Sequence, residues 1–256
     1  MSGIAFKTLG GRGVDIVLLH GFGSDRLSWL GTSPALMTLG RVHALDLPGH
    51  GDSTSDVGDG SPQALAHRVA AALVANGIYH AHLVGHSLGG GIALLLAAGD
   101  PSRVASLSLI APVGLGNGID PTFLNNYPQL DDVAPATEML QRLVHRPQLI
   151  NKMTVQRSLS HLRGDGTREA MTAIASQIAR HEIEFFKAAD EVTRLDLPRL
   201  AVWGESDTIN PLHRDRLAAF GGGCHIVAEA GHLPHIEAAK EVNDELASFL
   251  RRTLGR

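Results

Sequence analysis

The stretch Leu83-Val84-Gly85-His86-Ser87-Leu88-Gly89-Gly90-Gly91 decides how the rest of the chain is interpreted. It reads as the end of an apolar strand, a five-residue G-x-S-x-G turn, and an apolar helix that opens on three glycines. A turn from strand into helix within one residue strains the serine backbone, and the flanking glycines avoid Cβ collisions with the neighbouring strand and helix. Ser87 is expected at a helix N-terminus, where backbone N–H groups favour negative charge. The alternative is a plain strand-to-helix turn in which Ser87 merely caps the helix.

The composition excludes several classes of protein. The 256 residues suffice for one large domain, and the net charge of −4 does not favour a nucleic acid or an anionic membrane as partner. Cys224 is the single cysteine, which excludes an intrachain disulfide and a thiolate metal cluster. The 14 histidines are scattered without a metal-ligand spacing. No leader-like N-terminus and no run of 18 apolar residues is present, so we expect a cytoplasmic protein.

Apolar runs that alternate with helical patterns predict an α/β fold with a mostly parallel sheet flanked by helices. Strands are expected over residues 4–8, 14–19, 41–46, 82–84, 104–111, 199–203 and 225–228. Helices are expected over 61–76, directly after Ser87, and over 211–220 and 236–254. The helix at 61–76 has Ser61 at its N-cap and a proline in its first turn.

The segment 114–196 differs from the rest because it lacks buried-strand runs. It carries helical patterns over 136–144, 147–159 and 168–184 that prolines and glycines separate. We therefore expect a helical lid over 114–196, inserted between core segments 1–113 and 197–256. Five apolar lid side chains are candidates for a substrate pocket, although ordinary lid core is an equally good interpretation for most of them: Phe123, Tyr127, Met139, Leu143 and Phe186.

Three loops that follow predicted strands carry a serine, an acid and a histidine, in the order Ser87, Asp207 and His232. Ligands bind at the carboxyl ends of strands in open parallel sheets, where these loops would meet. His232 is the expected general base for the serine hydroxyl, and Asp207 would hold the imidazole tautomer. The oxyanion of a tetrahedral intermediate needs preorganised donors, which we assign to the backbone N–H groups of Phe22 and Leu88.

Other residues compete for these roles. His235 lies three positions after His232 but begins a predicted helix, whereas His232 lies in the loop. His86 precedes the nucleophile and should point away from it, in a packing role. An acid after the strand that ends at Ala111 would be an alternative to Asp207, but no acidic residue follows there.

The serine, acid and histidine order resembles that of the α/β-hydrolases, and the resemblance covers essentially the whole chain. The matching stretches are His20-Gly21-Phe22-Gly23, residues 46–53, Gly85-His86-Ser87-Leu88-Gly89-Gly90, Trp203-Gly204-Glu205-Ser206-Asp207 and residues 231–237.

A closer resemblance rests on Val57-Gly58-Asp59-Gly60-Ser61, on residues 107–116, and on Ala238, Lys240, Val242 and Asn243. These stretches resemble the hydrolase-fold domain of acetoin-dehydrogenase dihydrolipoamide acetyltransferase components. In that group the domain usually follows a lipoyl domain, whereas this sequence begins at the hydrolase core. The resemblance therefore implies either acyl transfer to a free or partner-borne dihydrolipoyl group, or plain hydrolysis.

Three functions from different classes follow. The leading one is a serine hydrolase that cleaves an ester, thioester or related acyl bond of a small apolar substrate through an acyl-enzyme. The second is a dihydrolipoamide acetyltransferase-like enzyme of acetoin or 2-oxo acid catabolism, in which a thiol captures the acyl group. The third is a non-catalytic protein that binds a small molecule. Carbon–carbon bond hydrolases share these motifs. No cofactor or metal is implied, and a homodimer or a dehydrogenase-complex partner is possible.

Overall fold

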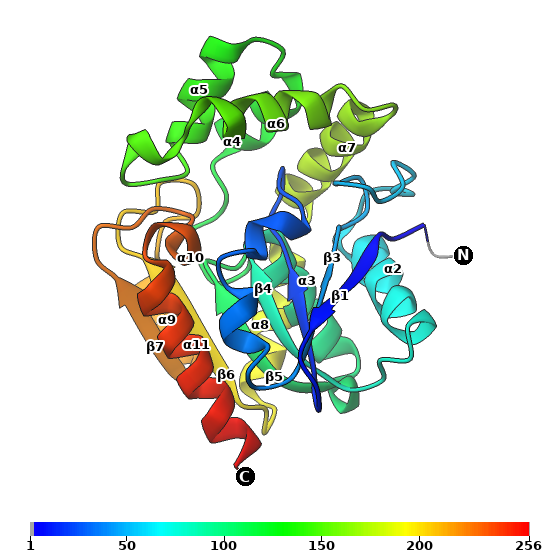
Figure 1. Ribbon diagram of the computed structural model, residues 1–256, viewed down its shortest axis with the longest axis vertical. Coiled ribbons are helices and arrows are strands. Elements are labelled where there is room, and N and C mark those ends of the chain that lie inside the picture. Colours follow the sequence, from blue (N-terminus) through cyan, green and yellow to red (C-terminus); the bar gives the residue numbers. More distant parts are fainter. Residues whose placement is uncertain (1–2, 256) are drawn as a thin grey trace.

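A seven-stranded sheet runs through the molecule in the computed structural model, which describes residues 3–255 (Figure 1). The strand order is β1-β3-β2-β4-β5-β6-β7, and every pair is parallel except β1 with β3. The strands are β1 (Phe6–Gly10), β2 (Asp15–Leu19), β3 (Arg41–Leu45), β4 (Ala81–His86), β5 (Val104–Ile110), β6 (Arg199–Gly204) and β7 (Gly223–Val227). The predicted mostly parallel sheet is confirmed, with an antiparallel strand at one edge.

Helices cover both faces of the sheet. On one face lie α2 (Pro62–Ala75), α3 (Leu88–Gly99), α8 (Glu182–Thr193) and α9 (Arg214–Phe220). On the other lie α1 (Ser33–Leu36), α10 (Pro234–Glu237) and α11 (Ala239–Leu254). Four short 3₁₀ turns complete the elements: η1 (Arg26–Trp29), η2 (Pro101–Arg103), η3 (Tyr127–Gln129) and η4 (Pro147–Leu149).

Because helices cover both faces of the sheet, the central strands are apolar at successive positions. Along β2, Val17 and Leu19 belong to the hydrophobic cluster under α2 and α3, whereas Ile16 and Leu18 belong to the cluster under α1 and α11. Successive side chains of a strand point to opposite faces, so a strand covered on both sides needs apolar residues at every position.

Four helices gather above one end of the sheet and form the lid, which we define as residues 121–180 (Figure 1). They are α4 (Pro121–Asn126), α5 (Val133–Gln141), α6 (Lys152–Leu162) and α7 (Thr167–Arg180). The helical lid was expected to extend to residue 196, but α8 packs along α3 as part of the core. The fit is close, because a Cβ on Gly91 of α3 would lie 2.7 Å from the ring of Phe185.

Some boundaries differ from the prediction. The expected helix over 168–184 ends at Arg180, and α8 begins after His181. The expected helix over 236–254 is divided into α10 and α11 at Ala238, which has φ −126° and therefore breaks the helical path. Within residues 3–255, no helix combines the length and the apolar character needed to cross a membrane.

Candidate active site

The turn between β4 and α3, residues 85–89, forms a sharp elbow that carries Ser87. Ser87 has φ 51° and ψ −115°, a conformation that L-residues rarely adopt. Its N–H donates to the carbonyl of Ile110 at 2.9 Å, and its own carbonyl accepts from the N–H of Val113 at 3.0 Å. A Cβ on Gly85 would lie 2.6 Å from the carbonyl oxygen of Gly89, and a Cβ on Gly89 would lie 2.5 Å from that of His20. The steric reason predicted for both glycines is therefore present.

The side chains of Ser87, His232 and Asp207 meet above the carboxyl ends of the strands. His232 Nε2 lies 2.9 Å from Ser87 Oγ, and His232 Nδ1 lies 2.7 Å from Asp207 Oδ2. All three residues are buried. An imidazole that donates from Nδ1 to a carboxylate presents Nε2 as an acceptor, which is the arrangement needed to take a proton from a hydroxyl.

The loop after β6 holds the Asp207 carboxylate with backbone donors. Asp207 Oδ1 accepts from the N–H groups of Ile209 and Asn210, both at 2.9 Å, which leaves Oδ2 for His232. Asn210 also donates from Nδ2 to the carbonyls of Ala111 at 3.0 Å and Pro112 at 2.9 Å. Asn210 thereby joins the acid loop to the end of β5. No local sequence pattern indicates this role, because the partners of Asn210 lie about a hundred positions away in the chain.

The loop after β2 supplies the first expected oxyanion donor. A Cβ on Gly21 would lie 3.0 Å from Ser87 Cβ, so this loop runs directly against the elbow. His20 braces it, with Nδ1 at 2.8 Å from the Gly21 carbonyl and Nε2 accepting from the N–H of Leu47. Within residues 3–255 neither the Phe22 N–H nor the Leu88 N–H donates to another protein group. Both amides are thus free to bind a developing oxyanion.

His86 connects the elbow to the loop that carries His232. Its Nε2 donates to the His232 carbonyl at 2.8 Å, and a Cβ on Gly21 would lie 2.7 Å from its Nδ1. Burial, followed by the nearby His235 and His232, holds the pKa of His86 well below its ordinary value, so the ring is neutral. Beyond the expected packing role, His86 contacts the His232 main chain, a contact between residues 146 positions apart, and it lines the cavity beside His232.

Glu237 is a second residue that holds the His232 loop in place, and the sequence analysis did not predict this role. Its Oε1 accepts from the N–H of Gly231 at 2.6 Å, and its Oε2 accepts from the N–H of His145 at 2.9 Å. The carboxylate therefore ties the His232 loop to the chain that follows α5. In the sequence analysis, Glu237 appears only as the last residue of the matching stretch 231–237, and no role is assigned to it.

The competing His235 lies behind the site and not in it. It is 1% exposed, and neither ring nitrogen has a hydrogen-bond partner among the described residues. Its ring packs against Trp29 and His86, with centroids 5.0 and 4.7 Å away. Burial lowers the pKa of His235 to about 3. Although several histidines gather here, within residues 3–255 no three His, Cys, Asp or Glu side chains are placed to hold a metal ion.

A cavity of about 220 Å³ lies between the His232 loop, the loop after β2 and the lid. Of the five predicted pocket residues, Phe123, Tyr127 and Leu143 line it. Met139 and Phe186 do not, which corrects that expectation. Met139 is buried within the lid, and the Phe186 ring packs under the Arg216 guanidinium at 3.6 Å, because α8 belongs to the core face.

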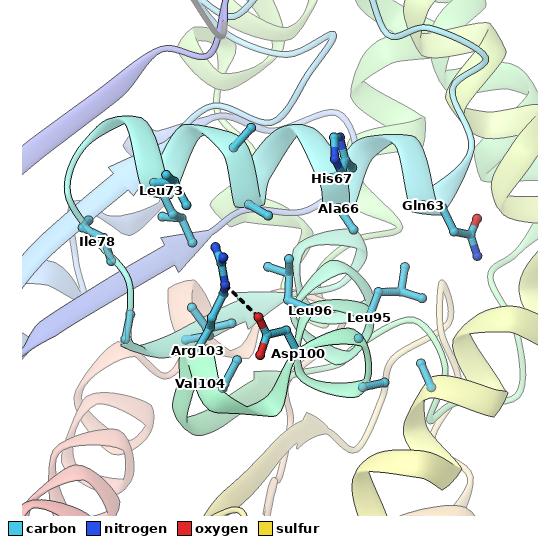
Figure 2. A pocket seen from close by; sticks show the side chains of 18 of the residues that line it. Gln63, Ala66, His67, Leu73, Ile78, Leu95, Leu96, Asp100, Arg103 and Val104 are labelled. Atoms are coloured by element: carbon cyan, nitrogen blue, oxygen red, sulfur yellow. Dashed lines mark hydrogen bonds and ion pairs between the residues drawn. The ribbon is translucent and has the colours of Figure 1, made fainter.

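A larger hollow of about 900 Å³ lies elsewhere, between α2, α3 and α8. Figure 2 shows it beneath α2, with Leu95 and Leu96 of α3 facing it and the Asp100–Arg103 ion pair near Val104. None of Ser87, Asp207 and His232 lines it. The small cavity is lined by His232, although not by Ser87 or Asp207, and is therefore the candidate substrate pocket.

The fold and this arrangement of serine, histidine and acid define a protein of the hydrolase class, and comparison with known proteins agrees. Residues 16–245 match the alpha/beta hydrolase family, to which the chain belongs. The chain is 37% identical over 252 residues, 96% of its length, to the dihydrolipoyllysine-residue acetyltransferase component of the acetoin cleaving system of Pseudomonas putida. It spans 66% of the length of that relative.

Two further relatives show the range of activities near this chain. It is 33% identical to the pimeloyl-[acyl-carrier protein] methyl ester esterase of Aeromonas hydrophila, with 78% of this chain and 80% of the esterase covered. The structure resembles that of a meta-cleavage product hydrolase from Pseudomonas fluorescens, with a TM-score of 0.84, 20% identity, and 97% and 94% of the two chains covered. That likeness shows the fold alone.

Proposed function

We propose that this chain is a serine hydrolase that cleaves an ester, thioester or related acyl bond of a small, largely apolar substrate through an acyl-enzyme. The observation that carries the proposal is the continuous contact from Asp207 through His232 to Ser87, at 2.7 and 2.9 Å. A serine that merely capped α3 would need no base, and Ser87 makes no side-chain hydrogen bond to the helix it precedes.

The proposed reaction follows from the geometry. His232 Nε2 takes the Ser87 proton as Oγ attacks the acyl carbon, and Asp207 stabilises the resulting imidazolium. The carbonyl oxygen becomes an oxyanion and accepts from the Phe22 and Leu88 amides, each worth roughly 3–4 kcal/mol in the transition state. The imidazolium then protonates the leaving alcohol or thiol, which departs and leaves an ester on Ser87. A second nucleophile, deprotonated by His232, releases the acyl group by the same steps in reverse.

A second candidate function differs only in that last nucleophile. The 37% identity to an acetyltransferase component of the acetoin cleaving system favours a thiol as acyl acceptor. In that case a dihydrolipoyl group, free or borne by a dehydrogenase-complex partner, would take the acyl group from Ser87.

The test is steady-state release of p-nitrophenol from its acetate, with and without dihydrolipoamide, by the wild type and by Ser87→Ala. Turnover that requires Ser87 and does not respond to the thiol supports a hydrolase. Acceleration by the thiol, with acetylated dihydrolipoamide as product, supports the transferase. Turnover that is unchanged in Ser87→Ala would overturn both.

A further inference from the structure

One wall of the reaction cavity is polar, and a single face of α6 provides most of it. Thr154, Arg157, Ser158 and His161 all line the cavity at helical spacing, three to four residues apart. Ser24 and Asp25 extend this polar wall from the loop after β2. Apolar side chains of the same loop and of the lid also line the cavity, and we call them the apolar wall: Phe22, Phe123, Tyr127, Leu140, Leu143 and Ile150.

The polar wall has no unpaired charge. Arg157 carries the one guanidinium or ammonium group among the described residues that line the cavity, and it binds Asp25 Oδ2 from Nη2 at 2.6 Å and from Nε at 3.1 Å. His161 is neutral near pH 7, because burial lowers its pKa below the ordinary value of 6.5. The remaining groups on α6 are the hydroxyls of Thr154 and Ser158.

We infer that this wall is a subsite for a neutral hydrogen-bonding group, an amide or a hydroxyl, on the alcohol or thiol half of the substrate. The inference rests on the proposed function, and it places the acyl half of the substrate on the apolar wall and the other half on the polar wall. Hydroxyl and imidazole groups can donate to and accept from an uncharged amide.

A free carboxylate on that half should bind poorly. Entry into the cavity would remove part of its water, although the Arg157 side chain is 51% exposed, and a desolvated charge needs a partner of opposite sign. Asp25 already occupies Arg157, so binding a carboxylate there would leave two carboxylates competing for one guanidinium. The subsite therefore selects by charge as well as by hydrogen bonding.

Two thioesters that differ only at the far end of the thiol half test the inference. S-acetyl-N-acetylcysteamine ends in an amide, and S-acetyl-3-mercaptopropionate ends in a carboxylate. We expect kcat/KM for the amide thioester to exceed that for the carboxylate thioester by at least about tenfold. Thiol release followed with a chromogenic disulfide measures both.

Variants of the polar wall test whether its side chains cause the preference for the amide thioester. The double variant Thr154→Val/Ser158→Ala should reduce the preference for the amide thioester by about five- to tenfold. Ser160→Ala, on the exposed side of the same helix, should leave the preference unchanged. Asp25→Asn should release Arg157 and raise kcat/KM for the carboxylate thioester relative to the amide, because Asn keeps the oxygen that caps η1 while removing the competing charge.

The outcomes separate this inference from the function on which it rests. Equal use of the two thioesters, or a preference for the carboxylate, with turnover that still requires Ser87, would overturn the subsite and leave the hydrolase standing. If neither thioester is turned over, calorimetric binding of N-acetylcysteamine and 3-mercaptopropionate to Ser87→Ala decides. Tighter binding of the amide thiol that is lost in the wall variant supports the subsite, and equal affinities overturn it.

Discussion

The sheet side of the candidate active site carries Ser87, Phe22 and His232 on loops that pack closely against one another. The lid side contributes side chains of α4, α5 and α6, or of the turns beside them, to the cavity next to His232. On the sheet side a single methyl group on Gly21 or Gly89 would collide with neighbouring atoms. The direct polar contacts from the lid to the loop after β2 are those of Tyr127 and Arg157, which bind Gly23 and Asp25. Under the proposed function, the catalytic groups are therefore positioned by tightly packed main chain, and the side chains that would select the substrate are contributed by the lid.

Because the sheet side is tightly packed main chain and the lid side is not, we expect substitutions on the sheet side to lower kcat by orders of magnitude. Substitutions in the lid should lower it less. The largest effect expected here is that of Asp207→Asn, which keeps an oxygen for the Ile209 and Asn210 amides but presents an amide to His232. The imidazole is then held in the wrong tautomer, and kcat should fall by about 10⁴-fold. Asp56→Asn, at an exposed position, is the matched control for ester turnover. A loss below tenfold would show that Asp207 does not orient the base.

Gly21→Ala tests the main-chain contact itself. The added Cβ would lie 2.7 Å from His86 Nδ1 and 3.0 Å from Ser87 Cβ, so the loop must move and displace the Phe22 amide. We expect kcat to fall by about 100-fold, as for loss of one oxyanion donor. Gly31→Ala, where a Cβ meets nothing within 4 Å, should leave kcat unchanged. Equal activity of the two variants would contradict the close packing of this loop on the elbow.

Tyr127→Phe tests the lid side. It removes the donation from the tyrosine hydroxyl to the Gly23 carbonyl at 2.7 Å, a bond that persists into alkaline solution because burial raises the pKa of Tyr127 to about 12. We expect a loss of about 1 kcal/mol in the free energy of unfolding, and a fall in kcat/KM of no more than about tenfold. Tyr79→Phe, at a tyrosine that is 64% exposed, should change neither quantity. A loss as large as that of Gly21→Ala would remove the distinction between the two sides.

The last prediction concerns stability and not catalysis, and it tests the buried His235 behind the sheet side. The pKa of His235 is about 3 in the folded chain and near 6.5 when unfolded, so between these values the unfolded state binds more protons. The free energy of unfolding must therefore decrease as pH falls from 6.5, by up to about 1.4 kcal/mol per pH unit for this one group. Urea unfolding at pH 7.5 and 5.0 should show a smaller decrease for His235→Leu than for the wild type. The exposed His67→Leu should match the wild type, and an unchanged decrease in His235→Leu would refute the assignment.

The elbow was predictable because local sterics dictate it. Gly85, Ser87 and Gly89 lie within five positions, and the backbone strain that they accommodate needs no distant information. The apolar runs predicted the strands that Ser87, Asp207 and His232 follow along the chain, but not the order of these strands in the sheet. The antiparallel pairing of β1 with β3 did not, because a short strand carries no mark of its direction.

The parts that were not predictable depend on contacts between distant residues. Helical periodicity shows where a helix lies along the chain but not which surface receives it. The α8 helix was therefore assigned to the lid although it packs on α3, and Phe186 was placed in the pocket with it. The bonds of Asn210 to Ala111 and of His86 to the His232 carbonyl join segments about 100 and 146 positions apart, which no local pattern reveals.

The chain between β5 and β6 comprises the lid and the core helix α8, and these strands are neighbours, with Leu107 opposite Arg199 and Ile110 opposite Val202. The sheet itself thus holds the two ends of the insertion together. The entropy of closing a flexible loop grows slowly, by about 0.6 kcal/mol for each doubling of its length. The length of the insertion can therefore change at small cost in loop-closure entropy, provided that the side chains that pack against the core are kept. A new acceptor preference can be acquired by recombining this one contiguous segment, without a change at Ser87.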